Sequence, residues 1–318
     1  MAEQRITNVI VPDVFTDYTL EPSIYMSKFF QSGVVGVDAQ LSALLNGGGK
    51  IFDAPFWKDI TKDSQIPSET VATTVNAITA SQQDVRRQFR EDAWGGNSLA
   101  KILAGDNALD KLAEMVNGYW AYNYDKVIIN SLEGIKLDNK ASNYSDLFNE
   151  TSAQFDEDGV YDTQGLVGEH QGKFDAIVVH SKIATLLKKQ NSIDYIPISD
   201  QGQLITKYLG MDLIIDDNVT VAGGVYTSIL FKSGAIQYGV GSTDYVPTEL
   251  ERDASTGFGI DKVYSRRVFS AHPVGFSWAD SSVGGTTPTN AELALATNWT
   301  RAYNKENSGV VFYDATLV

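Results

Sequence analysis

The feature that most constrains the fold is a continuous apolar stripe in residues 107–135. Apolar side chains recur there every three or four residues, which is the spacing of one face of an α-helix. They are Leu109, Leu112, Ala113, Val116, Trp120, Tyr124, Val127, Ile128, Leu132 and Ile135. Asn107 fits the N-cap, and Gly134 fits the position that ends a helix. At 1.5 Å per residue the helix would extend about 40 Å, so the fold must accommodate one element as long as a small domain.

Composition describes an ordinary folded chain without secretory or membrane signals. The length of 318 residues favours two domains, and 43% hydrophobic residues suffice for normal cores. The sequence has no run of eighteen apolar residues and no basic-then-apolar signal pattern at its start. The absence of cysteine excludes disulfides, thiolate zinc sites and a cysteine nucleophile.

Charge argues against a protein that wraps nucleic acid. The formal net charge is −15, whereas affinity for phosphate needs clustered Lys and Arg. The basic residues form only short pairs, at Arg86–Arg87, Lys188–Lys189 and Arg266–Arg267. Each pair is interpreted as a solvated or ion-paired face.

Two segments before the long helix lack enough apolar area to fold alone. Residues 1–46 place Pro12 and Pro22 among aromatic side chains, which predicts an extended arm, followed by a short helical patch. Residues 50–88 are predicted to form a long hairpin, with Pro55 in its first limb and a β-branched return limb over 69–79. An isolated hairpin is marginal in water, so we expect another surface to cover both segments.

The remaining segments predict a mixture of helices and strands. Residues 84–94 and 97–104 are predicted as short helices, and residues 136–172 as an acidic loop with one strand at 159–167. From residue 173, strand-then-helix patterns indicate a mixed sheet, with Ser181 as the N-cap of one helix. Thr289 and Glu292 form a capping box for a later helix.

No motif in the sequence supports catalysis, a cofactor or a metal. The run GGGK at 47–50 lacks the flanking residues of a phosphate loop, and the run at 257–259 lacks the third glycine of a dinucleotide fingerprint. The acidic run 156–162 lacks the glycine of a calcium loop. His180–Ser181 has no nucleophile elbow around it, and His272 before Pro273 is interpreted as structural. We therefore expect no catalytic, cofactor-binding or metal-binding residue.

An ordered set of sequence stretches covers nearly the whole chain and resembles one family. The stretches are 29–35 (FFQSGVV), 47–59 (GGGKIFDAPFWKD), 85–120, 174–199, 206–219, 266–278 (RRVFSAHPVGFSW) and 282–299. Together they resemble the major capsid (coat) protein of tailed bacteriophages, with the Hong Kong 97-type fold. The resemblance implies a mixed α+β subunit without an active site that tiles an icosahedral shell around packaged double-stranded DNA.

The resemblance also implies a division of the chain. Residues 1–49 would be an N-terminal arm and 50–88 an extended β-hairpin loop lying across an adjacent subunit. Residues 89–172 would be a peripheral domain with the spine helix 107–135. Residues 173–318 would be mainly an axial α/β domain, with part of the C-terminal stretch returning to the peripheral sheet. The helix should pack its apolar stripe on the long sheet and turn Lys111, Glu114 and Asp125 outward.

Inter-subunit contacts are expected in the arm, the hairpin and the hairpin base. The candidates are Phe15, Tyr18, Phe29, Phe30, Phe56, Trp57, Lys58, Arg86 and Arg87. Arg86, Arg87 and Arg90 are further candidates for a basic patch on the inside of the shell. Replacing Phe56 and Trp57 by alanine is expected to leave the subunit folded but to weaken assembly.

The implied partners are copies of the chain in pentamers and hexamers, a portal and possibly decoration proteins. Because the arm begins close to Met1, a separate scaffolding protein is expected rather than a fused one. The subunit would be made and assembled in the bacterial cytoplasm and would end in the virion capsid. An encapsulin-type compartment shell is the first alternative, and a sugar- or nucleotide-processing α/β enzyme the second.

Overall fold

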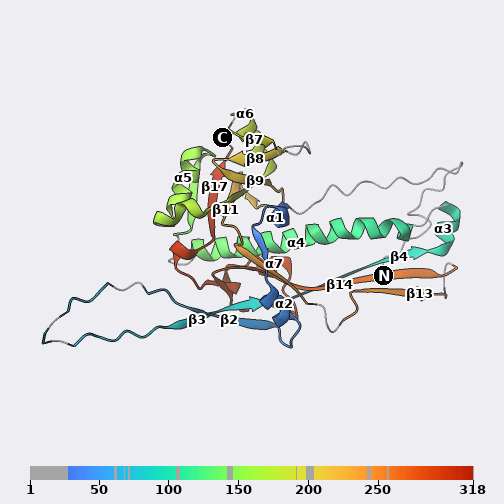
Figure 1. Cartoon of the computed structure of the whole chain (residues 1–318). Coiled ribbons are helices and arrows are strands. Elements are labelled where there is room, and N and C mark those ends of the chain that lie inside the picture. Colours follow the sequence, from blue (N-terminus) through green and yellow to red (C-terminus); the bar gives the residue numbers. More distant parts are fainter. Residues whose placement is uncertain are drawn as a thin grey trace.

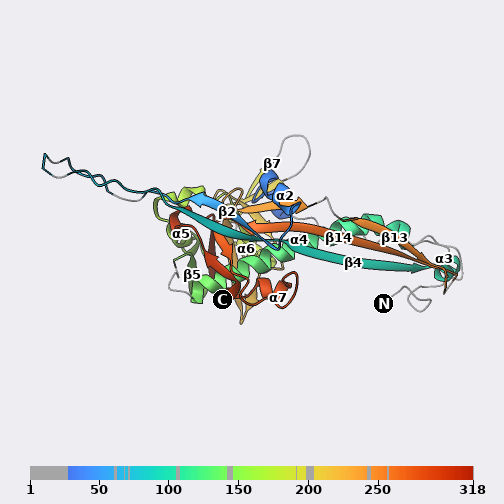
Figure 2. The same cartoon turned by 90° about the horizontal axis from the view of Figure 1, so that it is seen from below.

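The computed structural model shows an elongated subunit in which two sheets share one long helix (Figure 1). The structure describes residues 28–60, 63–67, 69–70, 72–104, 108–141, 146–190, 192–197, 204–241, 245–255 and 258–317. The shared helix is α4 (Ala108–Ala141), which has 34 residues. It crosses the body, with one sheet packed on each half of its length (Figures 1 and 2).

The long sheet follows strand β14, which changes partner along its length. It comprises β1 (Val35–Val37), β4 (Gln88–Asn97), β12 (Ile236–Gly241), β13 (Thr248–Asp253) and β14 (Ile260–Pro273). β4 pairs antiparallel with β14 on one side. On the other side, β14 pairs first with β13 and then with β12. One fourteen-residue strand therefore links the distal end of the subunit to its centre.

The second sheet has eight strands and mixed pairing. In spatial order it contains β5 (Phe148–Gln154), β17 (Val310–Thr316), β11 (Val225–Phe231), β6 (Ala176–Val179), β9 (Met211–Ile215), β8 (Leu204–Tyr208) and β7 (Asp194–Pro197), with β10 (Val221–Ala222) beside β11. β6 runs parallel to β9, and β11 runs antiparallel to both of its main neighbours. The apolar runs predicted as strands after residue 173 therefore form this sheet and parts of the long sheet.

Smaller elements complete the fold. Two two-stranded sheets pair β2 (Ile51–Trp57) with β3 (Ala80–Arg86) and β15 (Phe276–Trp278) with β16 (Trp299–Arg301). The other helices are α1 (Lys28–Gln31), α2 (Ala39–Leu45), α3 (Ser98–Ala104), α5 (Glu157–Gly165), α6 (Ser181–Lys189) and α7 (Asn290–Leu293), and the 3-10 turns are η2 (Gly168–Lys173), η3 (Ala296–Asn298) and η4 (Lys305–Asn307). The predicted capping box on α7 is confirmed by both of its hydrogen bonds.

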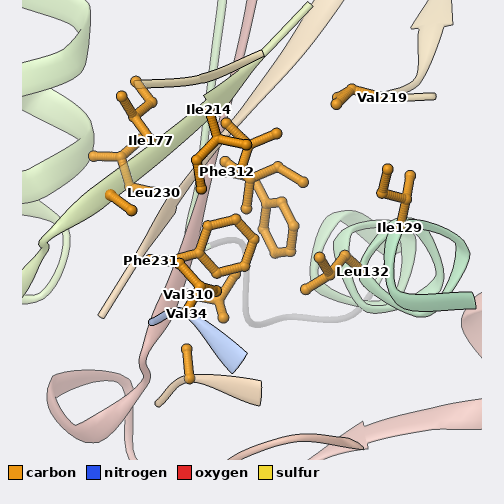
Figure 3. Close-up of a cluster of buried hydrophobic side chains, with 14 of the residues drawn as sticks. Val34, Ile129, Leu132, Ile177, Ile214, Val219, Leu230, Phe231, Val310 and Phe312 are labelled. Carbon is orange, nitrogen blue, oxygen red and sulfur yellow. The ribbon is translucent and has the colours of Figure 1, made fainter. Parts of the chain in front are cut away.

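Helix α4 joins the two sheets through different side chains on its two halves. In the N-terminal half, Trp120 Nε1 donates to Ser265 Oγ of β14 at 3.0 Å. In the C-terminal half, Ile129 and Leu132 face Phe231 and Phe312 of the eight-stranded sheet (Figure 3). The helix therefore buries its stripe against both sheets, whereas the stripe was predicted to pack on the long sheet alone.

A buried cation ties the same half of α4 to the eight-stranded sheet. Lys136 is 5% exposed, and its Nζ lies 3.0 Å from Glu133 of its own helix. The same Nζ donates to Thr227 Oγ1 of β11 at 2.9 Å and lies 3.7 Å from Asp314 of β17. A buried charge of this kind depends on its partners for compensation.

Three details of the predicted helix are wrong. It continues to Ala141. Gly134 lies inside the helix rather than at its end, and Leu293 and Trp299 pack so closely there that a Cβ would overlap them. Asp125 is 1% exposed rather than turned outward. Asn107 and the side chains of Lys111 and Glu114 lie outside the described residues.

Several predicted elements near the helix are also wrong. Residues 84–94 belong to strands β3 and β4 instead of a helix, because they pair with β2 and β14. The strand predicted at 159–167 is helix α5, capped by Asp156, whose carboxylate accepts from Gly159 N. The N-cap of α6 is His180, not Ser181. In the hairpin, the strand that pairs with β2 is 80–86, later than the predicted return limb.

Candidate assembly surfaces

The β2–β3 hairpin projects away from the rest of the subunit (Figures 1 and 2). Its strands pair from Ile51↔Arg86 to Trp57↔Ala80, and Lys58 N donates to Thr79 O at 2.9 Å just beyond them. Further out, the Gln65 side chain bridges the two limbs. Its Nε2 donates to Thr74 O at 2.7 Å, and its Oε1 accepts from Thr74 N at 2.8 Å. This pair of bonds brings the two limbs together and defines a tip of residues 66–73.

The hairpin exposes large apolar side chains that its own subunit leaves uncovered. The exposed fractions are 72% for Trp57, 91% for Ile66 and 93% for Val75. Apolar surface gathered on a projecting element marks an interaction site. Lys58 is exposed beside them. Phe56 differs from its neighbours, because it packs edge-to-face on Tyr303 of its own subunit at 4.6 Å between ring centroids.

Polar bonds fix the base of the hairpin to β15 and to the residue just before it. Gln83 Oε1 accepts from Gly275 N at 3.0 Å, and Asp84 N donates to Ser277 Oγ at 2.9 Å. Burial, followed by the neighbouring Asp53 carboxyl, raises the pKa of Asp84. These contacts set the direction in which the hairpin leaves the body.

Three arginines hold the same base from inside. Arg86 Nη2 donates to Thr286 O at 2.8 Å, and Arg90 Nη2 donates to Pro288 O at 2.9 Å. Arg87 Nη2 donates to the Leu45 carbonyl at 2.8 Å and to the Gly47 carbonyl, at the C-terminal end of α2. Arg86 is 4% exposed and Arg87 is 8% exposed. These side chains bind the subunit's own backbone, and the basic patch on the inside of the shell stays a prediction.

The contact candidates of the N-terminal arm differ in how far their side chains are buried. Phe29 is fully buried and meets Phe231 edge-to-face at 6.0 Å, so its side chain offers no surface to a neighbour. Phe30 is partly buried between Tyr124 and Tyr238. Phe15 and Tyr18 lie outside the described residues.

A second exposed surface, at the far end of the long sheet, was missed by sequence reasoning. Leu250 in β13 is 77% exposed, Phe258 in the following turn 76%, and Ile102 in α3 66%. Leu250 stands in the charged run TELERD, so its sequence context gives no sign that an exposed apolar side chain lies at the edge of the sheet. The signal becomes visible only when β13 is placed at the edge of the sheet.

The residues once considered for chemistry have structural roles here. His180 Nδ1 accepts from Lys182 N at 3.1 Å, and Asp217 accepts from Ser181 N at 3.0 Å, so both side chains cap α6. Within the described part of the chain, no group of three His, Asp or Glu side chains could hold a metal ion. None of the described helices is long and apolar enough to cross a membrane.

Comparison with known proteins gives a consistent result. No protein-family model matches the chain. The major capsid protein of Bacillus phage SPP1 is 32% identical over 325 residues, covering 100% of this chain and 99% of that protein. A Mycobacterium phage Che8 structure covers 96% of this chain and 97% of its own, with a TM-score of 0.57 at 14% identity. The capsid of Ralstonia phage GP4 covers 95% of both chains, with a TM-score of 0.57 at 9% identity.

A shell protein of another kind shares the fold. The SrpI encapsulin of Synechococcus elongatus covers 99% of this chain and 96% of its own, with a TM-score of 0.58 at 8% identity. The low identity of this match supports the fold alone. The full-length similarity to a phage coat protein, the projecting apolar hairpin and the Hong Kong 97-type architecture agree, and the chain belongs to the major capsid proteins of tailed bacteriophages.

Proposed function

We propose that this subunit tiles a closed icosahedral shell, in pentamers and hexamers of itself, around packaged double-stranded phage DNA. The observation that carries the proposal is the projecting hairpin with Trp57, Ile66 and Val75 exposed. A side chain the size of tryptophan gains about 1.5–3 kcal/mol or more when it is buried. A shell of identical subunits supplies the missing cover, since each hairpin then lies on a neighbour.

The parts of the subunit have distinct roles in this proposal. The arm 1–49 and the loop 50–88 reach neighbouring subunits. Helix α4 with the long sheet forms the peripheral part, and the eight-stranded sheet forms the axial part at the capsomer centre. The boundary between them does not follow the chain order, because β5 joins the eight-stranded sheet while β12, β13 and β14 join the long sheet.

The acidic character of the chain suits a shell that encloses DNA without binding it tightly. The net charge is −15, and the arginines at the hairpin base are held by backbone carbonyls. Like charge on shell and genome prevents tight non-specific binding to phosphate. A separate scaffolding protein, a portal, decoration proteins and assembly in the host cytoplasm belong to the same proposal and follow from the family resemblance.

Electron microscopy of the expressed chain tests the proposal, with and without its scaffolding protein. We expect shells, rings or curved sheets. The matched variants are Trp57→Ala, which removes an exposed ring, and Phe56→Ala, which removes a ring packed on Tyr303. Trp57→Ala should leave the subunit folded and impair assembly. Discrete small particles under every condition would contradict the proposal.

An encapsulin-like compartment is the second candidate, because a compartment shell shares the fold. The content of purified particles separates the two functions. Nuclease-protected DNA in particles from infected cells supports the phage capsid, and a cargo protein in place of DNA supports the compartment.

A further inference from the structure

A cavity beside the hairpin base is lined by four arginines and a single carboxylate, that of Glu91. The cavity has a volume of about 520 Å³ and lies between the end of α2, β4 and β14. Arg87, Arg90, Arg266, Arg267 and Glu91 line it together with the apolar or aromatic side chains Leu45, Phe89, Tyr245 and Val268. This size is in the range of sites that hold a small ligand or a few side chains.

Arg87 is only partly compensated by its own subunit. The guanidinium lies over the Phe52 ring at 4.8 Å and near the Phe89 ring at 5.8 Å, and its Nη2 binds carbonyls of α2. Its Nε is buried without a hydrogen-bond partner among the described residues. None of those residues places a carboxylate within 4.0 Å of it.

The other three arginines of the cavity have hydrogen-bond or ion-pair partners within the subunit, since Arg90 donates to Pro288 O and Asn290 Oδ1 and Arg267 donates to Arg266 O. Arg266 lies 2.8 Å from Glu249 and 3.6 Å from Glu91. Burial lowers the pKa of the Arg87 guanidinium, the direction expected of a cation that has lost water without gaining a carboxylate. Buried charges are normally paired, and a chain with 40 acidic residues and 25 basic ones has carboxylates to supply.

The hairpin tip has the complementary chemistry. Beyond the bridge between Gln65 and Thr74, residues 66–73 contain one charged residue, Glu69, and no cation. Glu69 is exposed, and Ile66 in the same tip is 91% exposed. The tip therefore presents one carboxylate and one large apolar side chain, which match a cavity where arginines outnumber carboxylates and Leu45, Phe89 and Val268 supply apolar lining.

The subunit's own tip cannot reach this cavity. Arg87 lies where β3 passes into β4, at the base of the hairpin, and the tip is at the opposite end of the same projection (Figures 1 and 2). We propose that the hairpin tip of a second copy enters the cavity, where Glu69 pairs with Arg87 and Ile66 packs on the apolar lining. This inference rests on the proposed function, because it needs copies in contact.

Cysteine cross-linking provides a direct test, since the chain contains no native cysteine. Gly48 adjoins Gly47 of the cavity rim, and a Cβ at Gly48 would meet nothing within 4 Å. Subunits carrying Gly48→Cys and differently tagged subunits carrying Ser68→Cys are assembled together and oxidised. We expect mixed disulfide dimers several-fold above those of a matched control, Gly172→Cys, whose site is equally open and lies in η2.

The charge pair is tested separately by Glu69→Gln, with Glu169→Gln as the control for removing one exposed charge. Breaking a desolvated pair between subunits should lower the association constant about tenfold or more, whereas the control should leave it unchanged. Arg87→Gln is a weaker test on its own, because it also removes the bonds to α2.

The outcomes separate this inference from the proposed function. Shells with the Gly48–Ser68 disulfide, together with weaker assembly of Glu69→Gln, support it. Shells in which this disulfide is no more abundant than the control overturn it and leave the proposed function intact. Unchanged assembly of Glu69→Gln overturns the ion pair. If the cysteine-free chain forms no shell with its scaffold, the proposed function fails and the inference fails with it.

Discussion

His272 should make the subunit less stable in acid. The side chain lies near the end of β14, is 2% exposed and is tilted 31° from the Trp299 ring at 6.2 Å. Its Nε2 has no hydrogen-bond partner among the described residues. Burial lowers the pKa of His272 from 6.5 to about 4, opposed by a hydrogen bond with the Phe276 backbone.

The direction of the effect follows from proton binding. Between the two pKa values the unfolded chain binds a proton at His272 and the folded chain does not, so stability falls as pH decreases through this window. Each pKa unit corresponds to about 1.4 kcal/mol. The loss is therefore negligible above pH 7, about 2 kcal/mol at pH 5, and about 3.4 kcal/mol when both states are protonated below pH 4.

Urea unfolding of the unassembled subunit at pH 7.5 and pH 5.0 measures this loss. Carboxylates contribute to the pH dependence of every variant, so the informative quantity is the difference between wild type and His272→Phe. The phenylalanine keeps an aromatic ring beside Trp299 and removes the titrating group. The wild type should lose about 2 kcal/mol more than the variant between the two pH values. Equal losses would refute the reasoning.

Three further predictions concern folding and assembly. Trp57→Ala should change the free energy of unfolding by less than about 0.5 kcal/mol, because the ring is 72% exposed, and should reduce the assembled fraction seen by sedimentation; a large loss of stability would place the ring in the subunit core. Gly134→Ala should destabilise by about 1–3 kcal/mol through overlap with α7 and β16, whereas the control Gly165→Ala, in open space on α5, should not, as thermal unfolding can show. Lys136→Met should lower the free energy of unfolding by about 3–5 kcal/mol, because it leaves the buried Asp314 and the partly buried Glu133 uncompensated; an unchanged denaturation midpoint would contradict this.

Sequence periodicity located the elements whose packing follows one simple pattern. The stripe from Leu109 to Ile135 predicted most of α4, and short apolar runs predicted strands such as β6 and β11. It failed where distant pairing overrides local pattern. Residues 84–94 are rich in charged and polar side chains and read as helix, yet ten residues of β4 pair with β14, far along the chain.

The assembly surfaces were also only partly predictable from the sequence. The sequence identified the hairpin and Trp57, because an isolated polar hairpin needs a partner surface. It could not separate Trp57 from Phe56, since only the fold places Tyr303 beside one ring. It also could not show that Arg87 is buried, because the carbonyls that bind it come from α2, about forty residues earlier.

The length of α4 has a mechanical consequence. One helix of 34 residues, about 50 Å long, packs on both sheets. The close contact of Gly134 with Leu293 and Trp299 leaves no room for the helix to slide. Rotating one sheet against the other would require bending a helix, and smooth helices bend only gently. The two sheets and helix α4 therefore move as one rigid body, and the elements at its edges can change their angle. Differences in angle between neighbours in a curved surface must be taken up by the hairpin and by the free end of β13.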